Sequence, residues 1–302
     1  MPFRPTFECL WCGTSHTVRS EADLEGWAQL CPTCLARAGE NEFLRFRLRD
    51  AIAERGRSRS AETTARAPEP AAAAQPALDD LVVYYESRAP EYDDWYLRRG
   101  RYDRGPIANM AWQADLDAAT MWLDALPFSG RIVELAAGTG WWSALLAGKG
   151  ELWLYDAADA PLELARRRLV AHGLTAHIHL RDAWADAEGT ADALFTGFWL
   201  SHVPDDRLGD FLRLARAWLK PGGIFAFVDS LDDPESSARD HPPVEDGVSI
   251  RRLNDGREFR ITKVLRTPEQ FRAALAEAGF EEMDVTSTTR FFVLGSASAP
   301  AE

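Results

Sequence analysis

Four cysteines, the only ones in the chain, form two C-x2-C pairs near its beginning. Cys9 and Cys12 make the first pair, and Cys31 and Cys34 follow after 18 intervening residues. Two thiolates on each of two tight turns can complete the tetrahedral coordination of one zinc ion, and this separation suits such a site. We therefore expect these four residues to bind a structural Zn²⁺.

Disulfide pairs, free thiols and a redox-active pair are the other interpretations of these cysteines. The N-terminus has no apolar signal segment, so we expect a cytoplasmic protein, in which disulfides are disfavoured. The pattern resembles a zinc ribbon or a treble-clef-like pair of knuckles over residues 7–37. His16 lies close by, but four thiolates already fill a tetrahedral site, and we interpret it as a bystander.

A glycine loop follows a hydrophobic run in the stretch "VELAAGTGWW", residues 133–142. A strand, a glycine loop and a helix in this order are typical of a site for a nucleotide-like ligand. A dinucleotide loop of the form G-x-G-x-x-G would place glycine at position 143, where this chain has Ser143. A P-loop would require Gly-Lys-Ser/Thr, which is absent. The sequence therefore disfavours both phosphate-binding interpretations.

Strands and helices alternate from residue 79 onward, which predicts a parallel sheet with helices on both faces. Helices are expected at 141–147, 160–173 and 206–223. Ligands of such sheets bind at the carboxyl ends of the strands, so we expect the glycine loop, the acids that end two strands and the segment after the fourth strand to converge. The expected strands are 131–135, 151–156, 176–182, 191–202 and 224–230.

The last part of the chain departs from a dinucleotide-binding pattern. Residues 249–265 alternate polar and apolar around Asn-Asp-Gly, which indicates a β-hairpin. A helix capped by Thr267, with Pro268 at its first position, comes next. Two closing strands at 283–289 and 290–297 are joined so tightly that they must pair antiparallel.

This ordered set of motifs strongly resembles the class I S-adenosylmethionine-dependent methyltransferases over about residues 79–296. The resemblance is carried by "ELAAGTG", "YDAA", "RDAW", "LKPGG" and the final strand pair. It implies an α/β fold with a Rossmann-like seven-stranded methyltransferase sheet, an antiparallel last strand and S-adenosyl-L-methionine as cofactor. With the cysteines, the expected fold also includes a small N-terminal four-cysteine zinc module.

The resemblance also implies how the cofactor is held. Two glycines of the loop would admit its methionine and ribose parts, because glycine has no Cβ. An acid at the end of the second strand would accept hydrogen bonds from the ribose, an acid after the third strand would accept from the adenine amino group, and a tryptophan would pack on the adenine. The expected cofactor-binding residues are Glu134, Ala136, Gly138, Gly140, Asp156, Ala157, Asp182, Ala183, Trp184 and Phe198.

Candidate residues for the acceptor side lie in three places. In similar methyltransferases the region of residues 84–105 forms a lid, although its aromatic residues would equally suit a core. His202 is the catalytic candidate, as a general base or alternatively as a structural histidine. Arg251 and Arg252 would contact an anionic group or lie on a solvated hairpin face. The candidate acceptor-side residues are Tyr84, Tyr85, Tyr92, Trp95, Trp199, His241 and Arg251.

We expect three segments. Residues 1–55 would form the zinc-knuckle module and a basic helix. Residues 56–78, which are rich in alanine and proline, would form a flexible linker, because they have too little apolar surface to offset the entropy of ordering. Residues 79–302 would form the methyltransferase domain, with a lid region at 79–125 and a core at 126–296.

The charge distribution limits the partners. The formal net charge is −13, and residues 1–66 are close to neutral, so the body is acidic and a large nucleic-acid interface is disfavoured. No apolar run approaches the roughly 20 residues that cross a membrane. We expect a small-molecule acceptor. RNA or protein presented by the zinc module is the alternative, because arginines gather at 45–59, and a non-catalytic protein that keeps the cofactor pocket is a third.

Overall fold

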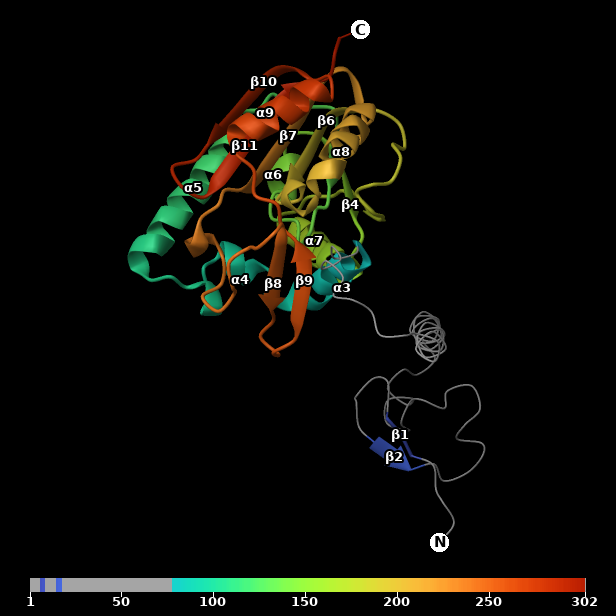
Figure 1. Ribbon diagram of the computed structural model, residues 1–302. Coiled ribbons are helices and arrows are strands. Elements are labelled where there is room, and N and C mark those ends of the chain that lie inside the picture. The colour runs from blue at the N-terminus through green and yellow to red at the C-terminus, as the bar shows by residue number, and fades with distance from the viewer. Residues whose placement is uncertain (1–5, 9–14, 18–77, 302) are drawn as a thin grey trace, which may run out of the picture. The chain divides into compact units, whose positions relative to one another are not determined.

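The computed structural model describes residues 6–8, 15–17 and 78–301 (Figure 1). The chain divides into two units, Met1–Ala73 and Ala74–Glu302. The second unit contains the glycine loop and every residue that the sequence assigns to the cofactor or the acceptor.

In the first unit the described residues form one strand pair. Strand β1 (Thr6–Glu8) pairs antiparallel with β2 (Ser15–Thr17), and Glu8 lies opposite Ser15. The residues between the strands, 9–14, include the first cysteine pair, but all four cysteines lie outside the described residues. The predicted basic helix and all but the end of the predicted linker lie outside them as well.

The second unit is built on a seven-stranded sheet in the order β10-β11-β7-β6-β3-β4-β5. Its strands are β3 (Arg131–Leu135), β4 (Glu151–Asp156), β5 (His177–Leu180), β6 (Ala191–Gly197), β7 (Leu219–Ser230), β10 (Glu281–Ser287) and β11 (Phe292–Ser298). Neighbours from β7 to β5 run parallel, whereas β11 is antiparallel to both β7 and β10. The predicted seven-stranded sheet with an antiparallel last strand is therefore confirmed. Strand order reverses between β3 and β6, the place where open α/β sheets bind ligands.

Helices cover both faces of this sheet. They are α3 (Leu78–Arg88), α4 (Asp93–Tyr96), α5 (Pro106–Ala125), α6 (Ser143–Ala147), α7 (Asp159–Ala171), α8 (Asp205–Ala217) and α9 (Pro268–Glu277). Ile132 of β3 packs in one apolar cluster with residues of α5, α6 and α7, and Val133 packs in another with residues of α8 and α9. Successive side chains of a strand point to opposite faces, so β3 is buried on both sides.

Two predicted boundaries are wrong. The strand expected to reach residue 202 ends at Gly197, because Phe198 has a φ of 58°, which breaks the extended conformation. The helix expected to reach residue 223 ends at Ala217, and its Pro-Gly-Gly turn lies inside β7. Leu219 is buried and is the parallel-strand partner of Ala191, so sheet pairing ends the helix early.

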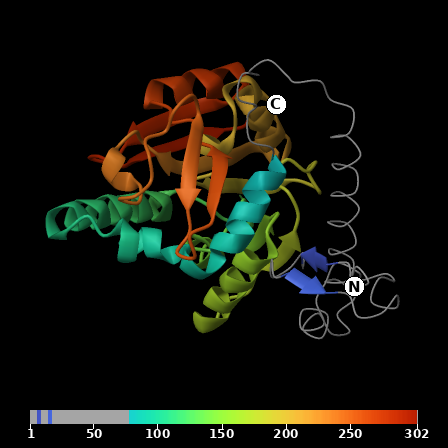
Figure 2. The same ribbon diagram turned by 60° about the horizontal axis from the view of Figure 1, so that its bottom comes forward.

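The hairpin predicted from Asn-Asp-Gly is present as a separate two-stranded sheet of β8 (Val248–Arg252) and β9 (Glu258–Thr262). It lies beside α3, near the end of the large sheet (Figure 2). The predicted cap of α9 is a full capping box, in which Thr267 and Gln270 satisfy each other's backbone N–H groups. None of the described helices combines the length and the apolar character that crossing a membrane demands.

Candidate active site

The glycine loop between β3 and α6 is fastened to the end of the neighbouring strand β4. The N–H of Gly138 donates to Oδ2 of Asp156 over 2.8 Å, and the N–H of Ala158 donates to its Oδ1 over 2.8 Å. One carboxylate thus fixes both the loop and the start of α7. Burial raises the pKa of Asp156 to about 6, although the two hydrogen bonds act to lower it. The carboxyl group is therefore still mostly ionised at neutral pH.

The two glycines of the loop serve different purposes. Both have positive φ, +56° at Gly138 and +71° at Gly140. A Cβ on Gly140 would lie 2.7 Å from the Cβ of Ala165, so this glycine lets the loop pack against α7. A Cβ on Gly138 would meet the Tyr92 hydroxyl at 3.4 Å beside a cavity. The sequence assigns both glycines to cofactor contact, but only Gly138 lies at the cavity.

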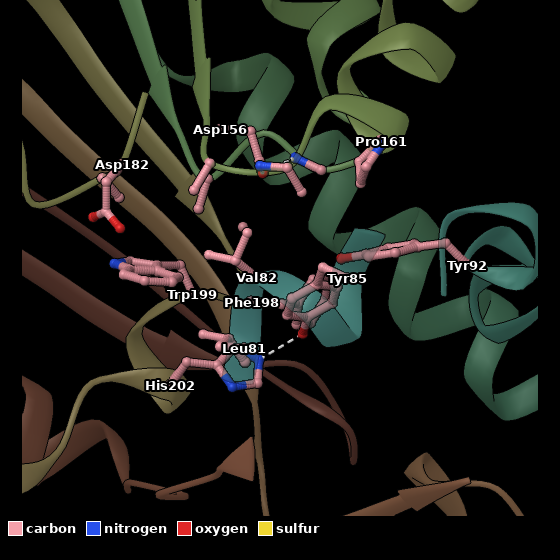
Figure 3. A pocket seen from close by; sticks show the side chains of 16 residues that line it. Leu81, Val82, Tyr85, Tyr92, Asp156, Pro161, Asp182, Phe198, Trp199 and His202 are labelled. Carbon is pink, nitrogen blue, oxygen red and sulfur yellow. Dashed lines mark hydrogen bonds between the residues drawn. The ribbon is translucent and has the colours of Figure 1, made fainter. Parts of the chain in front are cut away.

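This cavity, of about 590 Å³, opens at the carboxyl ends of β3, β4 and β6 (Figure 3). We call it the acidic cavity, because Asp156 and Asp182 line it, and no lysine or arginine is among its described lining residues. The other walls are largely apolar and aromatic. The lining residues are Leu81, Val82, Tyr85, Tyr92, Ala136, Gly138, Asp156, Ala157, Ala158, Pro161, Asp182, Ala183, Gly197, Phe198, Trp199 and His202.

The acidic cavity does not suit a phosphate. Carboxylates repel phosphate oxygens, and the described lining supplies no cation to offset that repulsion. Two hydrogen-bond acceptors set in apolar walls instead suit a nucleoside without phosphate, whose hydroxyl and amino groups act as donors. The nucleoside part of S-adenosylmethionine has this chemistry.

Seven of the ten residues that the sequence assigns to the cofactor line the acidic cavity. They are Ala136, Gly138, Asp156, Ala157, Asp182, Ala183 and Phe198. Of the other three, Gly140 packs against α7, and Glu134 lies beneath the loop, 1% exposed, with Oε2 located 2.6 Å from Oγ of Ser143. Burial raises the pKa of Glu134 to about 8, so this carboxyl is mostly protonated at neutral pH.

Trp184 is the third residue that does not line the cavity. Its backbone N–H donates to Oδ1 of Asp182, but its ring packs edge-on against Phe211, with 5.2 Å between centroids, and under Arg207. Trp199, which the sequence assigns to the acceptor, lies beside Asp182 in the cavity (Figure 3). The aromatic wall next to Asp182 therefore comes from the loop after β6.

Two non-glycine residues of the cavity have left-handed backbone conformations. Ala136 has a φ of 53° and Phe198 a φ of 58°. Such conformations are disfavoured for residues with a Cβ and gather at functional sites. The N–H of Phe198 is held by the carbonyl of Val228 over 2.7 Å, which fixes the loop that carries Trp199 against the cavity.

The sequence misses part of the lining. Leu81 and Val82 of α3 and Pro161 of α7 face the cavity (Figure 3). The apolar run "LVVYY" at 81–85 gives a usable signal, because its first residues belong to the same helix as the tyrosines assigned to the lid. Pro161 gives none, since its place depends on the path of the chain after β4.

His202 is buried and uses both ring nitrogens (Figure 3). Nδ1 lies 2.7 Å from the carbonyl oxygen of Thr262, and Nε2 lies 2.7 Å from the Tyr85 hydroxyl. A carbonyl only accepts, so Nδ1 carries the proton and Nε2 accepts from Tyr85. Burial lowers the pKa of His202 well below 6.5, and the nearby Lys263 lowers it further.

A second cavity, of about 500 Å³, shares the side chains of Tyr85, Tyr92, Phe198 and His202 with the first. We call it the basic cavity, because three cationic residues and no carboxylate appear in its described lining. His241, a candidate for the acceptor, lines neither cavity but lies 3.0 Å from Nη1 of Arg251. The lining residues are Tyr84, Tyr85, Arg88, Tyr92, Trp95, Tyr102, Phe198, His202, Ser230, Ser236, Ser237, Arg251, Ile261 and Lys263.

The predicted zinc site lies outside the part of the chain that the structure describes. Within residues 6–8, 15–17 and 78–301, no group of three or more His, Cys, Asp or Glu residues could hold a metal ion. Zinc binding by the four cysteines therefore stays a prediction.

Comparison with known sequences places this site among methyltransferases. Residues 132–223 match a family model described as a methyltransferase domain. The ubiquinone/menaquinone biosynthesis C-methyltransferase UbiE of Proteus mirabilis is 30% identical over 178 residues, which cover 53% of this chain and 69% of that enzyme. The UbiE of Shewanella oneidensis is 26% identical over 176 residues, with the same coverage of 53% and 69%.

Solved structures agree. A DhpI-SAM-HEP complex is 28% identical, with a TM-score of 0.59, and the match covers 75% of this chain and 99% of DhpI. The sheet order, the cavity at the switch point and these relatives lead to one conclusion: the chain is an S-adenosylmethionine-dependent methyltransferase and belongs to class I of that family.

Proposed function

We propose that this methyltransferase acts on a small-molecule acceptor. The observation that carries the proposal is the arrangement of two adjoining cavities, one suited to the cofactor and one of similar size beside it. Concave sites in which a few polar groups are set among apolar and aromatic side chains are typical of small-molecule binding. Two relatives support it, since UbiE acts in ubiquinone/menaquinone biosynthesis and DhpI forms a complex with SAM and HEP.

The acidic cavity would hold the cofactor. Asp156 would accept hydrogen bonds from the ribose hydroxyls, Asp182 from the adenine amino group, and Trp199 would pack on the adenine in place of Trp184. Gly138 and Ala136 would line the methionine part. Glu134 would act from beneath, by holding Ser143 at the start of α6.

The remaining chemistry is positioning. The bound cofactor supplies an electrophilic methyl group, so the protein needs mainly to align a nucleophile with it, which can contribute about 7–11 kcal/mol. We propose that His202 is a positioning residue and not a base, because both its nitrogens are engaged and it holds the Tyr85 hydroxyl at the wall between the cavities. Tyr85, Tyr92 and Phe198 would shape that wall.

Isothermal titration of S-adenosylhomocysteine into the full chain tests the cofactor site. We expect one-to-one binding, and at least about a 100-fold loss for Asp156→Ala, because a hydrogen bond to a charged group contributes about 1.5–3 kcal/mol and two are lost. Asp210→Ala, an exposed acid on α8, is the matched control and should bind normally. Equal affinity for the Asp156 and Asp210 variants would refute the assignment.

Methyl transfer itself is tested with cofactor labelled in its methyl group and a metabolite extract. We expect label in a compound small enough to pass an ultrafiltration membrane that retains proteins and RNA. Label that appears only in RNA or protein, and is lost when residues 1–66 are deleted, would favour the alternative acceptor.

We further propose that Cys9, Cys12, Cys31 and Cys34 bind zinc in a module at residues 1–55, joined by a linker at 56–78 to the methyltransferase domain at 79–302. The pairing of β1 with β2 on either side of the first C-x2-C supports it. Metal analysis of the full chain should find one zinc per chain, and about none after Cys31→Ser with Cys34→Ser. Full zinc retention in that double variant would disprove the site.

A further inference from the structure

The basic cavity brings together cations from two separate parts of the chain, α3 and the β8–β9 hairpin. Arg88 ends α3, Arg251 lies on β8, and Lys263 directly follows β9. Arg88 is far from the other two in sequence, and the position of the β8–β9 hairpin beside α3 brings it to them (Figure 2). A cluster of three cations is unexpected in a chain with a net charge of −13, because acids outnumber bases over most of its sequence.

Arg88 is the most unusual of the three. It is 8% exposed, and its buried Nε has no hydrogen-bond partner among the described residues. It lies instead among four tyrosine rings, 4.6 Å from the centroid of Tyr92 and 5.6–5.9 Å from those of Tyr84, Tyr85 and Tyr102. A guanidinium has five N–H donors, and buried donors without partners are unfavourable. Arg88 is thus a buried cation whose Nε lacks a hydrogen-bond acceptor, and its side chain lines the basic cavity.

The other two cations are held mainly by neutral groups. Nη1 of Arg251 donates to Oγ of Ser237 over 2.6 Å and lies 3.0 Å from Nδ1 of His241. Burial lowers the pKa of His241 to about 4, and the adjacent Arg251 lowers it too, so this ring stays neutral and accepts from the arginine. Within the described residues, no carboxylate pairs with Arg88 or Arg251, so neither charge is neutralised.

Lys263 has the only carboxylate partner of the three. Its Nζ donates to Oγ of Ser201 over 2.7 Å and to Oγ of Ser230 over 3.2 Å, and Oδ1 of Asp229 is 3.9 Å away. Three positive charges therefore face one negative charge in this part of the described structure. A ligand with one or two negative charges would balance them and supply the acceptors that Arg88 lacks.

We propose that the methyl acceptor carries an oxyanion, a carboxylate or a phosphoryl group, which Arg88, Arg251 and Lys263 bind in the basic cavity. The proposal rests on the proposed function, because it names the class of acceptor for the same enzyme. The shared wall of Tyr85, Tyr92, Phe198 and His202 places the anionic end of the acceptor one side chain away from the acidic cavity. The charges of the two cavities would direct each ligand to its own site, since carboxylates line the cavity proposed for the cofactor and cations line the cavity proposed for the acceptor.

Direct titration tests the anion site without knowledge of the acceptor. Inorganic phosphate and acetate are titrated separately into the full chain, with and without saturating S-adenosylhomocysteine, in Tris buffer at neutral pH. We expect at least one of them to bind, and about tenfold weaker binding after Arg88→Gln or Arg251→Gln, as loss of one charge-assisted hydrogen bond predicts. The anion that binds more tightly distinguishes a phosphoryl acceptor from a carboxylate acceptor.

Arg252→Gln is the matched control. Arg252 neighbours Arg251 on β8, but it is exposed and pairs with Glu258, so its loss should leave anion affinity within about twofold. If Arg88→Gln does not fold, Arg251→Gln on the half-buried hairpin face still decides the question. Failure of both anions to bind, or equal effects of the Arg251 and Arg252 variants, would overturn the proposal.

A second experiment follows the acceptor itself. A metabolite extract is separated on an anion-exchange resin at neutral pH, and each fraction is incubated with the enzyme and methyl-labelled cofactor. We expect the label in the retained fraction, and a raised KM for that fraction with Arg251→Gln while S-adenosylhomocysteine affinity is unchanged. Label confined to the unretained fraction would overturn the proposal. A chain that binds no S-adenosylhomocysteine would instead disprove the proposed function, and phosphate or acetate titration would still test the anion site.

Discussion

The two cavities share a wall but are built from different parts of the fold. The acidic cavity lies at the carboxyl ends of β3, β4 and β6, with its carboxylates at positions that the sheet dictates. The cations of the basic cavity come from α3 and from the hairpin inserted between β7 and α9. In our proposal the sheet provides the cofactor site, and the added segments provide selectivity for the acceptor.

The cavities also differ in how their charges are satisfied. Asp156 accepts two backbone N–H groups, so the cofactor side is fixed before any ligand binds. On the other side, Lys263 has serine and carboxylate partners, whereas Arg88 has only aromatic rings among the described residues. Lys263 is thus bonded within the folded structure, and in our proposal Arg88 is held ready for a ligand at some expense of stability.

The largest expected effect is a difference in stability between variants of Lys263 and variants of Arg88. Lys263→Met should lower the free energy of unfolding by about 3 kcal/mol, because it leaves buried Asp229 without a cation. Arg88→Met should change it by no more than about 1 kcal/mol, since the lost cation–π contacts offset the relief of unpaired donors. Urea denaturation followed by circular dichroism measures both.

Asp229→Asn combined with Lys263→Met is the control for that prediction and should recover most of the lost stability. A large destabilisation by Arg88→Met, as great as that of Lys263→Met, would show that Arg88 is a structural residue and would remove the distinction between the two cations.

A smaller effect distinguishes the two glycines of the acidic side. Gly140→Ala should lower the free energy of unfolding by about 2 kcal/mol, because it combines a left-handed backbone with a clash against Ala165. Gly138→Ala meets only the edge of Tyr92 and should lower the free energy of unfolding by about 1 kcal/mol. Relative to its effect on stability, Gly138→Ala should weaken S-adenosylhomocysteine binding more than Gly140→Ala does. The reverse ranking in stability would contradict the packing role of Gly140.

A further expected effect is a pH dependence of the acidic side. The pKa of Asp156 is raised to about 6, so the carboxyl is mostly ionised at about pH 7 and mostly protonated at about pH 5. If the ionised form binds the ribose, affinity for S-adenosylhomocysteine should fall by about tenfold between these two pH values. Titration calorimetry at both measures this, and Asp156→Asn, which cannot ionise, should show little change.

The sequence predicts the acidic side far better than the basic side, for physical reasons. Strand periodicity locates the ends of β3 and β4, and hence Asp156, because these features are local. The neighbours of a residue across the fold are not local. Nothing in the sequence shows that Ala165 blocks a side chain at Gly140, or that Trp199 and not Trp184 faces the cavity.

The basic cavity depends still more on long-range placement. The hairpin is predictable from its turn, and Arg251 can be singled out on it as a contact for an anion. Arg88 and Lys263 carry no such signal, because each acquires its meaning only when the hairpin lies beside α3. The burial of Arg88 among four tyrosine rings is visible only in three dimensions.

A crystal structure of the full chain with S-adenosylhomocysteine tests the central claim most directly. We predict the nucleoside in the acidic cavity, with both ribose hydroxyls on Asp156, the adenine between Asp182 and Trp199, and the sulfur facing Tyr85 and Tyr92. A nucleoside located in the basic cavity, or a ribose that makes no contact with Asp156, would contradict the account.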